Sequence, residues 1–342
     1  MNRTHQLRRA VGAALAQAAP MAGRCKRAHQ AGLTLIELMI ALAVGLVVML
    51  ALSMVFFGSN SARREVELSA EAIENGRHAI DILTREMAQA GYYGTLGQVG
   101  GIALPAGDVC KPTVTTIGSS LVTHAMAYLP GAYPTCIADR VKPGTHVLYT
   151  QRASTCAVGE ANCAAEVMNL PYLQVSECGS EYGATPFLVA QGQSGNAVFK
   201  LRDKACVSTQ HSAPRALLRR LYFVDINNEL VYQELSLPGF TDPAPVLVSE
   251  GIEDMRLQFA VDANGNGSID SGELVATPAD WRGVIGLRVA LLSISRQPGT
   301  SSTGTRSFDL AGNTVLRADD RFKRRAYSTV ILFETPALRG QS

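Results

Sequence analysis

The stretch "GLTLIELMIALAVGLVVMLALSMVFF", residues 32–57, determines how the rest of the chain is interpreted. The 25 residues after Gly32 contain one threonine, one serine and a single charged side chain, Glu37; the others are apolar. As a helix rising about 1.5 Å per residue, they would extend about 37 Å, more than a hydrocarbon core of about 30 Å. Residues 1–32 hold six Lys and Arg residues and no acidic one, which favours a cytoplasmic position for that end. The sequence therefore predicts a single-pass membrane segment over residues 33–57.

The helix is predicted to continue past the membrane segment, through residues 58–94. Val66, Ile73, Ile80 and Met87 recur at seven-residue intervals in an otherwise polar stretch. This spacing indicates an apolar stripe on a helix that packs against a folded domain. Two glycines flanking a pair of tyrosines then favour the end of the helix.

Gly32 followed by "LTLIEL" resembles the class III signal of type IV pilins and type II secretion pseudopilins. The resemblance implies that a prepilin peptidase cuts after Gly32 and methylates the new terminus, Leu33, where the family usually has phenylalanine. It also places the acidic residue of the family on Glu37. An ionised carboxylate in lipid requires a partner, and the implied partner is the terminal amine of a neighbouring subunit. Glu37 is therefore predicted to act in assembly.

The leader is long for this class of signal. A start at Met21 would give a short basic leader, "MAGRCKRAHQAG", which is more typical. We therefore hold both Met1 and Met21 as possible start sites.

The cysteines indicate an oxidising compartment. Of the seven in the chain, one lies in the leader, and the others share a region rich in glycine, threonine and serine without CxxC or Cys/His metal spacing. Such usage is typical of disulfides in exported proteins. The six are Cys110, Cys136, Cys156, Cys163, Cys178 and Cys206. Cys156 and Cys163 are expected to form a local pair, whereas the remaining connectivity stays open.

The distribution of turns and strands divides the chain into five predicted regions. These are a leader at 1–32, the membrane half of the helix at 33–57, its amphipathic half at 58–94, a cysteine-rich region of loops and strands at 95–212, and an antiparallel sheet at 213–342. Apolar strands with short turns recur after residue 216, in stretches such as "GVIGLRVALLSIS" and "AYSTVILFET". The predicted fold class is α+β, with the long helix covering one face of an antiparallel sheet and an irregular, disulfide-rich middle.

A calcium-binding loop is predicted at residues 262–273, "DANGNGSIDSGE". The stretch fits the spacing D-x-[DN]-x-[DN]-G-x5-E, in which alternate residues of a tight loop present oxygen ligands to Ca²⁺. The predicted ligands are Asp262, Asn264, Asn266, Ser268 through its carbonyl, Asp270 and Glu273. No flanking helices are expected, and a plain Asn-Gly turn is the alternative interpretation.

Further stretches narrow the resemblance to the PilW family of minor pilins. They include "DILTREMAQAGYYG" at the helix end, "EGIEDMRLQFAVD" before the Asp/Asn loop, and "RRAYSTVILFETPAL" near the terminus. The family implies a subunit that assembles with other minor pilins and the major pilin on the inner-membrane platform, and that primes and caps the type IV pilus. It implies an anchored chain with a periplasmic domain, later a part of the fibre. Pilus biogenesis, twitching motility and adhesion would depend on it.

Two alternative functions remain open at this stage. One is a J-type pseudopilin of a type II secretion system, which shares the leader and a similar fold. The other is a pilus-tip module that binds DNA or surfaces through the basic runs "RALLRR" (215–220) and "RFKRR" (321–325), although few aromatic residues accompany them. The chain has no GxSxG, HExxH or Gly-rich phosphate loop, so we expect no enzymatic activity.

Overall fold

The computed structural model describes residue 32 and residues 34–97, 109–193, 198–270, 272–302, 304–318 and 320–334. The chain forms two compact units, Met1–Gly58 and Ser59–Ser342. The leader up to residue 31 and the predicted methylation site Leu33 lie outside the described residues.

The long helix predicted from the sequence is present as α1 (Leu35–Ala88). Its residues up to Gly58 are exposed, including every apolar side chain from Leu35 to Phe57. In the described part of the chain, α1 is the one helix with the length and apolar composition to cross a membrane. Beyond its end, Gly91 adopts a positive φ of 75°, a conformation that suits glycine and ends helices.

The part of α1 in the second unit packs against the folded domain through a stripe of small and large apolar residues. The buried positions are Leu68, Ala72, Gly76, Ala79, Leu83 and Met87. They follow steps of four and three residues, as a helix with 3.6 residues per turn requires. The predicted seven-residue line was therefore wrong at its start: Val66 is 68% exposed, and the buried line begins at Leu68 instead.

The larger sheet of the second unit has seven strands, all paired antiparallel. Its strands are β1 (Ala125–Tyr128), β2 (Val147–Ala153), β3 (Pro171–Val175), β4 (Phe187–Gln191), β5 (Arg215–Val224), β6 (Leu230–Glu234) and β7 (Val246–Ser249). The long strand β5 is the centre of this sheet, because β2 pairs along one edge and β3 and β6 share the other.

The second sheet has four strands in the order β13-β10-β8-β9, and a separate hairpin accompanies it. Its strands are β8 (Ile252–Val261), β9 (Leu274–Val275), β10 (Val284–Ile294) and β13 (Arg324–Leu332), and the hairpin consists of β11 (Arg306–Leu310) and β12 (Asn313–Arg317). Short helices α2 (Val114–Ser119), α3 (Gly179–Tyr182) and η2 (Trp281–Gly283) complete the described elements. Apolar side chains of the hairpin cover Ala290 and Leu292 of β10.

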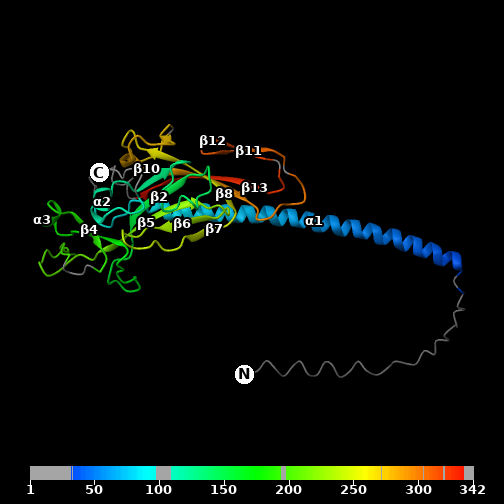
Figure 1. Ribbon diagram of the computed structural model, residues 1–342, viewed down its shortest axis with the longest axis horizontal. Coiled ribbons are helices and arrows are strands. Elements are labelled where there is room, and N and C mark those ends of the chain that lie inside the picture. Colours follow the sequence, from blue (N-terminus) through cyan, green and yellow to red (C-terminus); the bar gives the residue numbers. More distant parts are fainter. Residues whose placement is uncertain are drawn as a thin grey trace, which may run out of the picture. The chain divides into compact units, whose positions relative to one another are not determined.

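The main core lies between α1 and the two sheets (Figure 1). Helix residues such as Leu83 and Met87 pack with Leu148 and Tyr222 of the larger sheet and with Leu257, Phe259 and Leu287 of the smaller one. The α+β prediction, with the helix on antiparallel strands, is confirmed. The burial pattern of the strands explains it, because the helix needs an apolar partner and the inward side chains of the sheets supply one.

The predicted division at residue 212 is not a boundary of the fold. Strands β2 and β3, from the cysteine-rich region, pair with β5, from the region expected to form a separate sheet. Most of these middle strands are short and lack strict alternation, so the sequence pattern alone did not reveal that they belong to one sheet.

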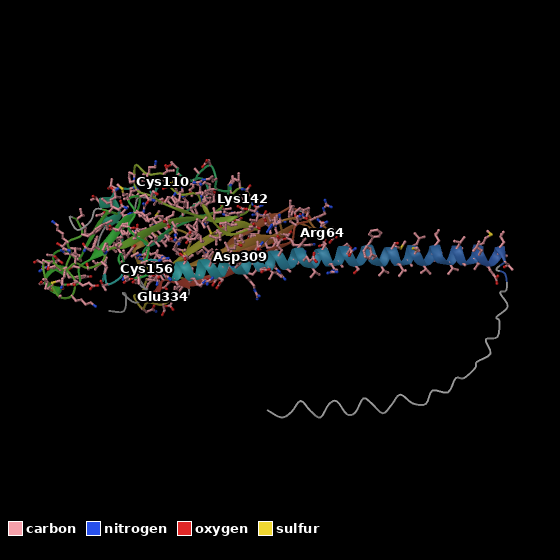
Figure 2. All side chains as sticks on the ribbon, turned by 90° about the horizontal axis from the view of Figure 1, so that it is seen from below. Arg64, Cys110, Lys142, Cys156, Asp309 and Glu334 are labelled. Carbon is pink, nitrogen blue, oxygen red and sulfur yellow. A yellow bond between two sulfur atoms is a disulfide. The ribbon has the colours of Figure 1, made fainter. Side chains whose placement is uncertain are left out.

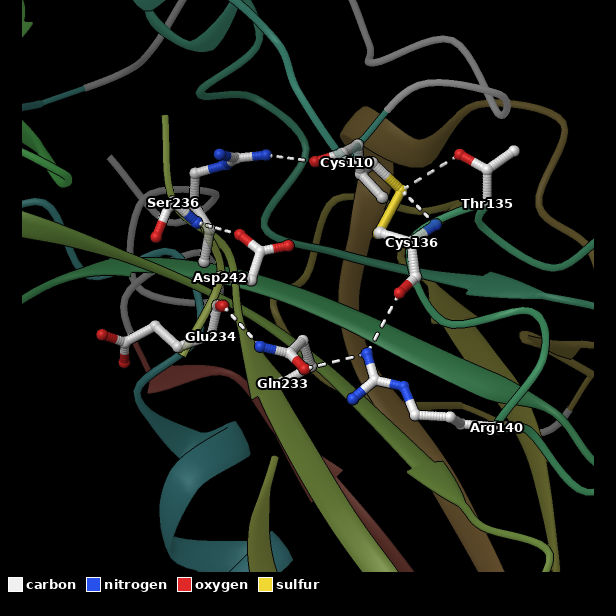
Figure 3. Close-up of a disulfide and its surroundings, with 10 residues drawn as sticks. Cys110, Thr135, Cys136, Arg140, Gln233, Glu234, Ser236 and Asp242 are labelled. Atoms are coloured by element: carbon white, nitrogen blue, oxygen red, sulfur yellow. Dashed lines mark hydrogen bonds between the residues drawn. A yellow bond between two sulfur atoms is a disulfide. The ribbon is translucent and has the colours of Figure 1, made fainter. Parts of the chain in front are cut away.

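The six cysteines of the second unit form three disulfides, Cys110–Cys136, Cys156–Cys163 and Cys178–Cys206. The expected local pair, Cys156–Cys163, is present. Around Cys136 the structure adds polar support: Arg140 donates hydrogen bonds to the Cys136 carbonyl at 3.0 Å and to Oε1 of Gln233 at 3.1 Å (Figure 3). Arg140 therefore connects the loop that carries Cys136 to strand β6.

Candidate functional site

The first candidate site lies at the start of α1, where Thr34 precedes the helix. The backbone N–H and the hydroxyl of Thr34 donate to Oε2 of Glu37, at 2.9 and 3.0 Å. In return, the Glu37 N–H donates to the Thr34 hydroxyl at 3.3 Å, which completes a reciprocal capping box. The box satisfies backbone donors of the first turn, which have no partner inside the helix.

The capping box was not anticipated from the sequence, although the spacing T-x-x-E is a signal for it. It gives Glu37 a role within its own chain through one carboxylate oxygen. The other oxygen, Oε1, has no hydrogen bond with the residues that the structure describes. Gly32 is exposed near this end, while Leu33 lies outside the described residues.

The second candidate site is the loop between β8 and β9, at residues 262–273. The Asp262 carboxylate receives the backbone N–H groups of Gly265 at 2.7 Å and Gly267 at 2.8 Å, which folds the loop around its first residue. At the other end, Glu273 closes the loop by accepting the N–H of Ala263 at 3.1 Å and that of Asp270 at 2.8 Å. The loop is thus compact and lies between two paired strands, as expected.

The predicted ligands of this loop converge. The side-chain amides of Asn264 and Asn266 each donate to Oδ2 of Asp270 at 2.8 Å. These three side chains occupy loop positions three, five and nine, and carboxylate and amide oxygens are the ligands that Ca²⁺ prefers. The amide oxygen of Asn264 accepts the backbone N–H of Asn266 at 3.0 Å. Ser268 contributes its N–H to Oδ1 of Asn266 at 2.8 Å.

Two further features tie the loop to the sheet. The backbone N–H of Asp262 donates at 3.2 Å to the carbonyl of Gly283, the last residue of η2. Trp281 in η2 packs edge-on against Phe259 of β8, with ring centroids 4.8 Å apart. Trp281 is therefore partly buried and packs against the core beside the loop.

The first basic run considered for nucleic acid does not form a charged surface. Arg219 is fully buried, where its guanidinium donates to the Val109 carbonyl and to the Tyr149 hydroxyl. Arg220 forms ion pairs with Glu86 at 2.8 Å and Glu234 at 3.2 Å. Both arginines of β5 therefore have their partners within the folded unit.

Comparison with known proteins finds two family models, one near each end of the chain. Residues 221–334 match the family model of the type IV pilus-assembly protein W, and residues 27–53 match the prokaryotic N-terminal methylation motif. A solved structure, the type IV-like pilin from Thermus thermophilus, is similar at 11% identity over 80% of this chain and 96% of the other, with a TM-score of 0.34. No curated protein sequence matches the chain.

The two family models cover the parts of the chain that carry its anchor and most of its C-terminal strands. The motif includes Gly32 and Glu37, and the pilus-assembly domain runs from within β5 to beyond β13. The chain thus carries a methylation motif on its apolar helix and resembles the PilW family of type IV pilus-assembly proteins in its C-terminal strands.

Proposed function

We propose that this chain is processed after Gly32, methylated at Leu33, and then assembles with other minor pilins and the major pilin to prime and cap the type IV pilus. Prepilin peptidase and the inner-membrane platform would act on it before incorporation, and twitching motility and adhesion would follow from the fibre. Proteins of this class are structural subunits. A deletion should abolish piliation and leave type II secretion intact, which separates this function from that of a pseudopilin.

The observation that carries the proposal is a single charge in an apolar helix. Glu37 uses one carboxylate oxygen to cap its own helix, and its negative charge remains uncompensated by the described residues. A charge at membrane depth is costly unless an opposite charge approaches it. The methylated amine of an adjoining subunit would supply that charge when the subunits assemble.

Substitutions at Glu37 and Thr34 can separate the cap from the charge. Glu37→Gln keeps an oxygen that accepts the Thr34 donors but removes the charge, whereas Thr34→Val removes the hydroxyl and keeps the charge. We expect Glu37→Gln to be cleaved normally and yet to be absent from sheared pili, by mass spectrometry and immunoblot. Thr34→Val should retain most incorporation.

Thr34→Ser, which retains the hydroxyl, serves as the matched control. Normal incorporation of Glu37→Gln would show that charge pairing does not drive assembly. Normal incorporation of Glu37→Gln together with loss of incorporation in Thr34→Val would assign the role of Glu37 to the helix cap alone.

We also propose that the loop at residues 262–273 binds one calcium ion. The support is the convergence of Asn264, Asn266 and Asp270 and the closure of the loop by Glu273. The ion would hold β8 and β9 together at this end of the smaller sheet. The loop has three carboxylates, Asp262, Asp270 and Glu273, which give it a moderate negative charge. This charge suits calcium binding in an extracellular medium.

Calorimetry on the purified full chain tests this proposal. Wild type should give saturable heat with Ca²⁺ and a higher unfolding temperature, and Glu273→Gln should lose most of both because it removes a bidentate ligand. Glu229→Gln, in the turn between β5 and β6, is the matched control. The absence of calcium heat at millimolar concentrations would refute the site.

A further inference from the structure

A set of exposed arginines lies where α1 enters the second unit, and the proposed functions above do not use it. We name it the basic collar: Arg63 and Arg64 on α1, and Arg321 and Arg325 around the start of β13. All four are exposed, and none forms an ion pair with the residues that the structure describes. Arg64 makes one neutral hydrogen bond, to Oε1 of Gln297 at 3.1 Å.

The collar is held together by a neighbouring clamp on α1. The Glu65 carboxylate accepts the Thr300 hydroxyl at 2.8 Å and the Ser301 N–H at 3.2 Å, and it pairs with Lys323. Lys323 holds the pKa of Glu65 down to about 2, so this carboxylate stays ionised and neutralises that lysine. The clamp thus fixes the 321–325 segment beside α1 and leaves the collar arginines uncompensated.

Two clefts flank this part of α1. One, of about 670 Å³, is lined by Arg63 and Arg64, by Glu67, and by the ion pair of Arg296 with Glu71, so Arg63 and Arg64 are its uncompensated cations. The other, of about 490 Å³, is lined by Arg325 and Lys323 together with Ser301. Both are polar and open, so they suit a hydrated anionic group rather than an apolar ligand. Guanidinium groups present several donors in a fixed plane that matches phosphate oxygens.

The position of the collar along the chain identifies the occupant. Arg63 follows the last apolar residue of the membrane run, Phe57, by six positions. At about 1.5 Å per helical residue this is about 9 Å, close to the outer edge of the headgroup layer, which adds about 5 to 7 Å beyond the hydrocarbon core. Cations at this depth are attracted to anionic lipid surfaces.

The net charge of the rest of the molecule bears on whether the collar itself attracts an anionic lipid surface. After residue 32 the chain holds 25 Lys and Arg residues, since six of 31 lie in the leader, against 29 acidic residues. The exported part is therefore acidic as a whole, and a general attraction to a negative membrane is not expected. Figure 2 shows Arg64 at the end of the folded unit from which the apolar part of α1 extends.

We propose that the basic collar binds the phosphate headgroups of anionic phospholipids in the leaflet where the membrane segment ends. The contact would hold the folded unit against the bilayer before the subunit is incorporated into a fibre. This proposal goes beyond the assembly role, because it concerns the membrane-anchored chain before it joins other subunits. It does not depend on Glu37.

The test measures which lipids the full chain retains. Purified chain from mixed phosphatidylglycerol and phosphatidylcholine nanodiscs would be analysed by native mass spectrometry for the ratio of the two bound lipids. We expect a clear preference for phosphatidylglycerol that weakens with salt. Each double variant, Arg63→Gln with Arg64→Gln or Arg321→Gln with Arg325→Gln, should reduce the preference by about tenfold.

Lys200→Gln with Lys204→Gln is the matched control, since it removes two exposed cations near the Cys178–Cys206 disulfide. It should leave the preference unchanged, and added glycerol phosphate should not displace the lipid if the bilayer is the source of the anion. Equal retention of both lipids by wild type, or an equal loss in the control, would overturn the proposal. It would also be overturned if collar variants kept lipid preference but lost recovery of sibling pilins, because the collar would then be a protein interface.

Discussion

Some single residues of this protein, such as His146, have structural roles that cannot be predicted from the adjacent sequence. His146 precedes β2 and links the two sheets: its N–H donates to the Met255 carbonyl at 3.0 Å, and its Nδ1 accepts the Leu257 N–H at 3.2 Å. Burial, together with the nearby charge of Arg256, lowers the pKa of His146 to about 4. The imidazole is therefore neutral in the folded protein at ordinary pH.

The shifted pKa of His146 predicts a pH dependence of stability. The unfolded chain binds the proton with a pKa near 6.5 and the folded chain with one of about 4. Stability is therefore full above pH 6.5 and is lost as the pH falls toward 4, by at most about 1.4 kcal/mol per pH unit. Denaturant unfolding at several pH values should show this slope in wild type.

His146→Gln should remove this component of the slope, because glutamine can accept the Leu257 N–H and does not titrate. His78→Gln, on the exposed face of α1, should retain the slope. If wild type and His146→Gln lose stability in parallel between pH 6.5 and 4, the neutral imidazole does not contribute.

At the scale of elements, the contact between α1 and the smaller sheet depends on one glycine. A Cβ atom on Gly76 would lie 2.2 Å from Cε2 of Tyr327 in β13, whose hydroxyl donates to the Ile73 carbonyl at 3.1 Å. The tyrosine ring is thus fixed at both ends, and helix and sheet can approach closely only because Gly76 has no side chain.

Gly76→Ala should destabilise the folded unit although alanine favours helices by about 1 kcal/mol over glycine. Overpacking against the ring is expected to cost about 1 to 3 kcal/mol, measured by denaturant unfolding. Gly58→Ala, on the same helix, meets nothing within 4 Å and is the control. Adding Tyr327→Leu to Gly76→Ala should recover part of the loss; no recovery would place the strain elsewhere.

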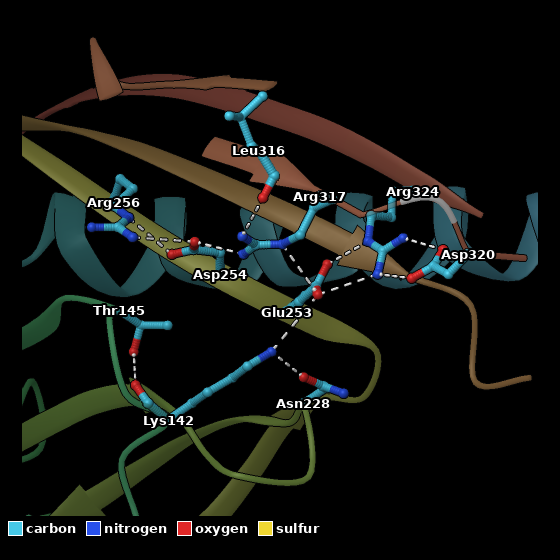
Figure 4. A network of polar contacts seen from close by, with 10 residues as sticks. All are labelled: Lys142, Thr145, Asn228, Glu253, Asp254, Arg256, Leu316, Arg317, Asp320 and Arg324. Atoms are coloured by element: carbon cyan, nitrogen blue, oxygen red, sulfur yellow. Dashed lines mark hydrogen bonds and ion pairs between the residues drawn. The ribbon is translucent and has the colours of Figure 1, made fainter. Parts of the chain in front are cut away.

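At the scale of the whole folded unit, a network of charges joins parts that are distant in sequence (Figure 4). Arg324 of β13 pairs with Glu253 of β8 at 2.6 Å, and Arg317 of β12 pairs with Asp254 at 2.9 Å. Lys142, before β2, reaches Asn228 at 2.5 Å and Glu253 at 4.0 Å. Half-buried ion pairs contribute little net stability but penalise wrong arrangements, so the network fixes how the hairpin and sheets align.

The sequence by itself determined those features that depend on local pattern. The apolar run with its single acid, the hairpin of β5 and β6 with Asn228 at positive φ, and the break between β7 and β8 at Gly251 were all predictable, because turn chemistry and periodicity act over a few residues. The cysteines indicated disulfides for the same reason, and the calcium ligand set of the loop at residues 262–273 stays a prediction. The T-x-x-E cap was equally local and was overlooked.

Only the tertiary structure decided which segments meet. That β2 and β3 flank β5, that Arg219 is buried, and that Lys323 and Thr300 clamp Glu65 each depend on residues far apart in the chain. Strand pairing and ion pairs of this kind are selected by the packing of the complete core, where many weak preferences are satisfied together. A local sequence pattern does not predict which distant segments pack together. The basic collar could therefore be recognised only from the tertiary structure, which places its two segments side by side.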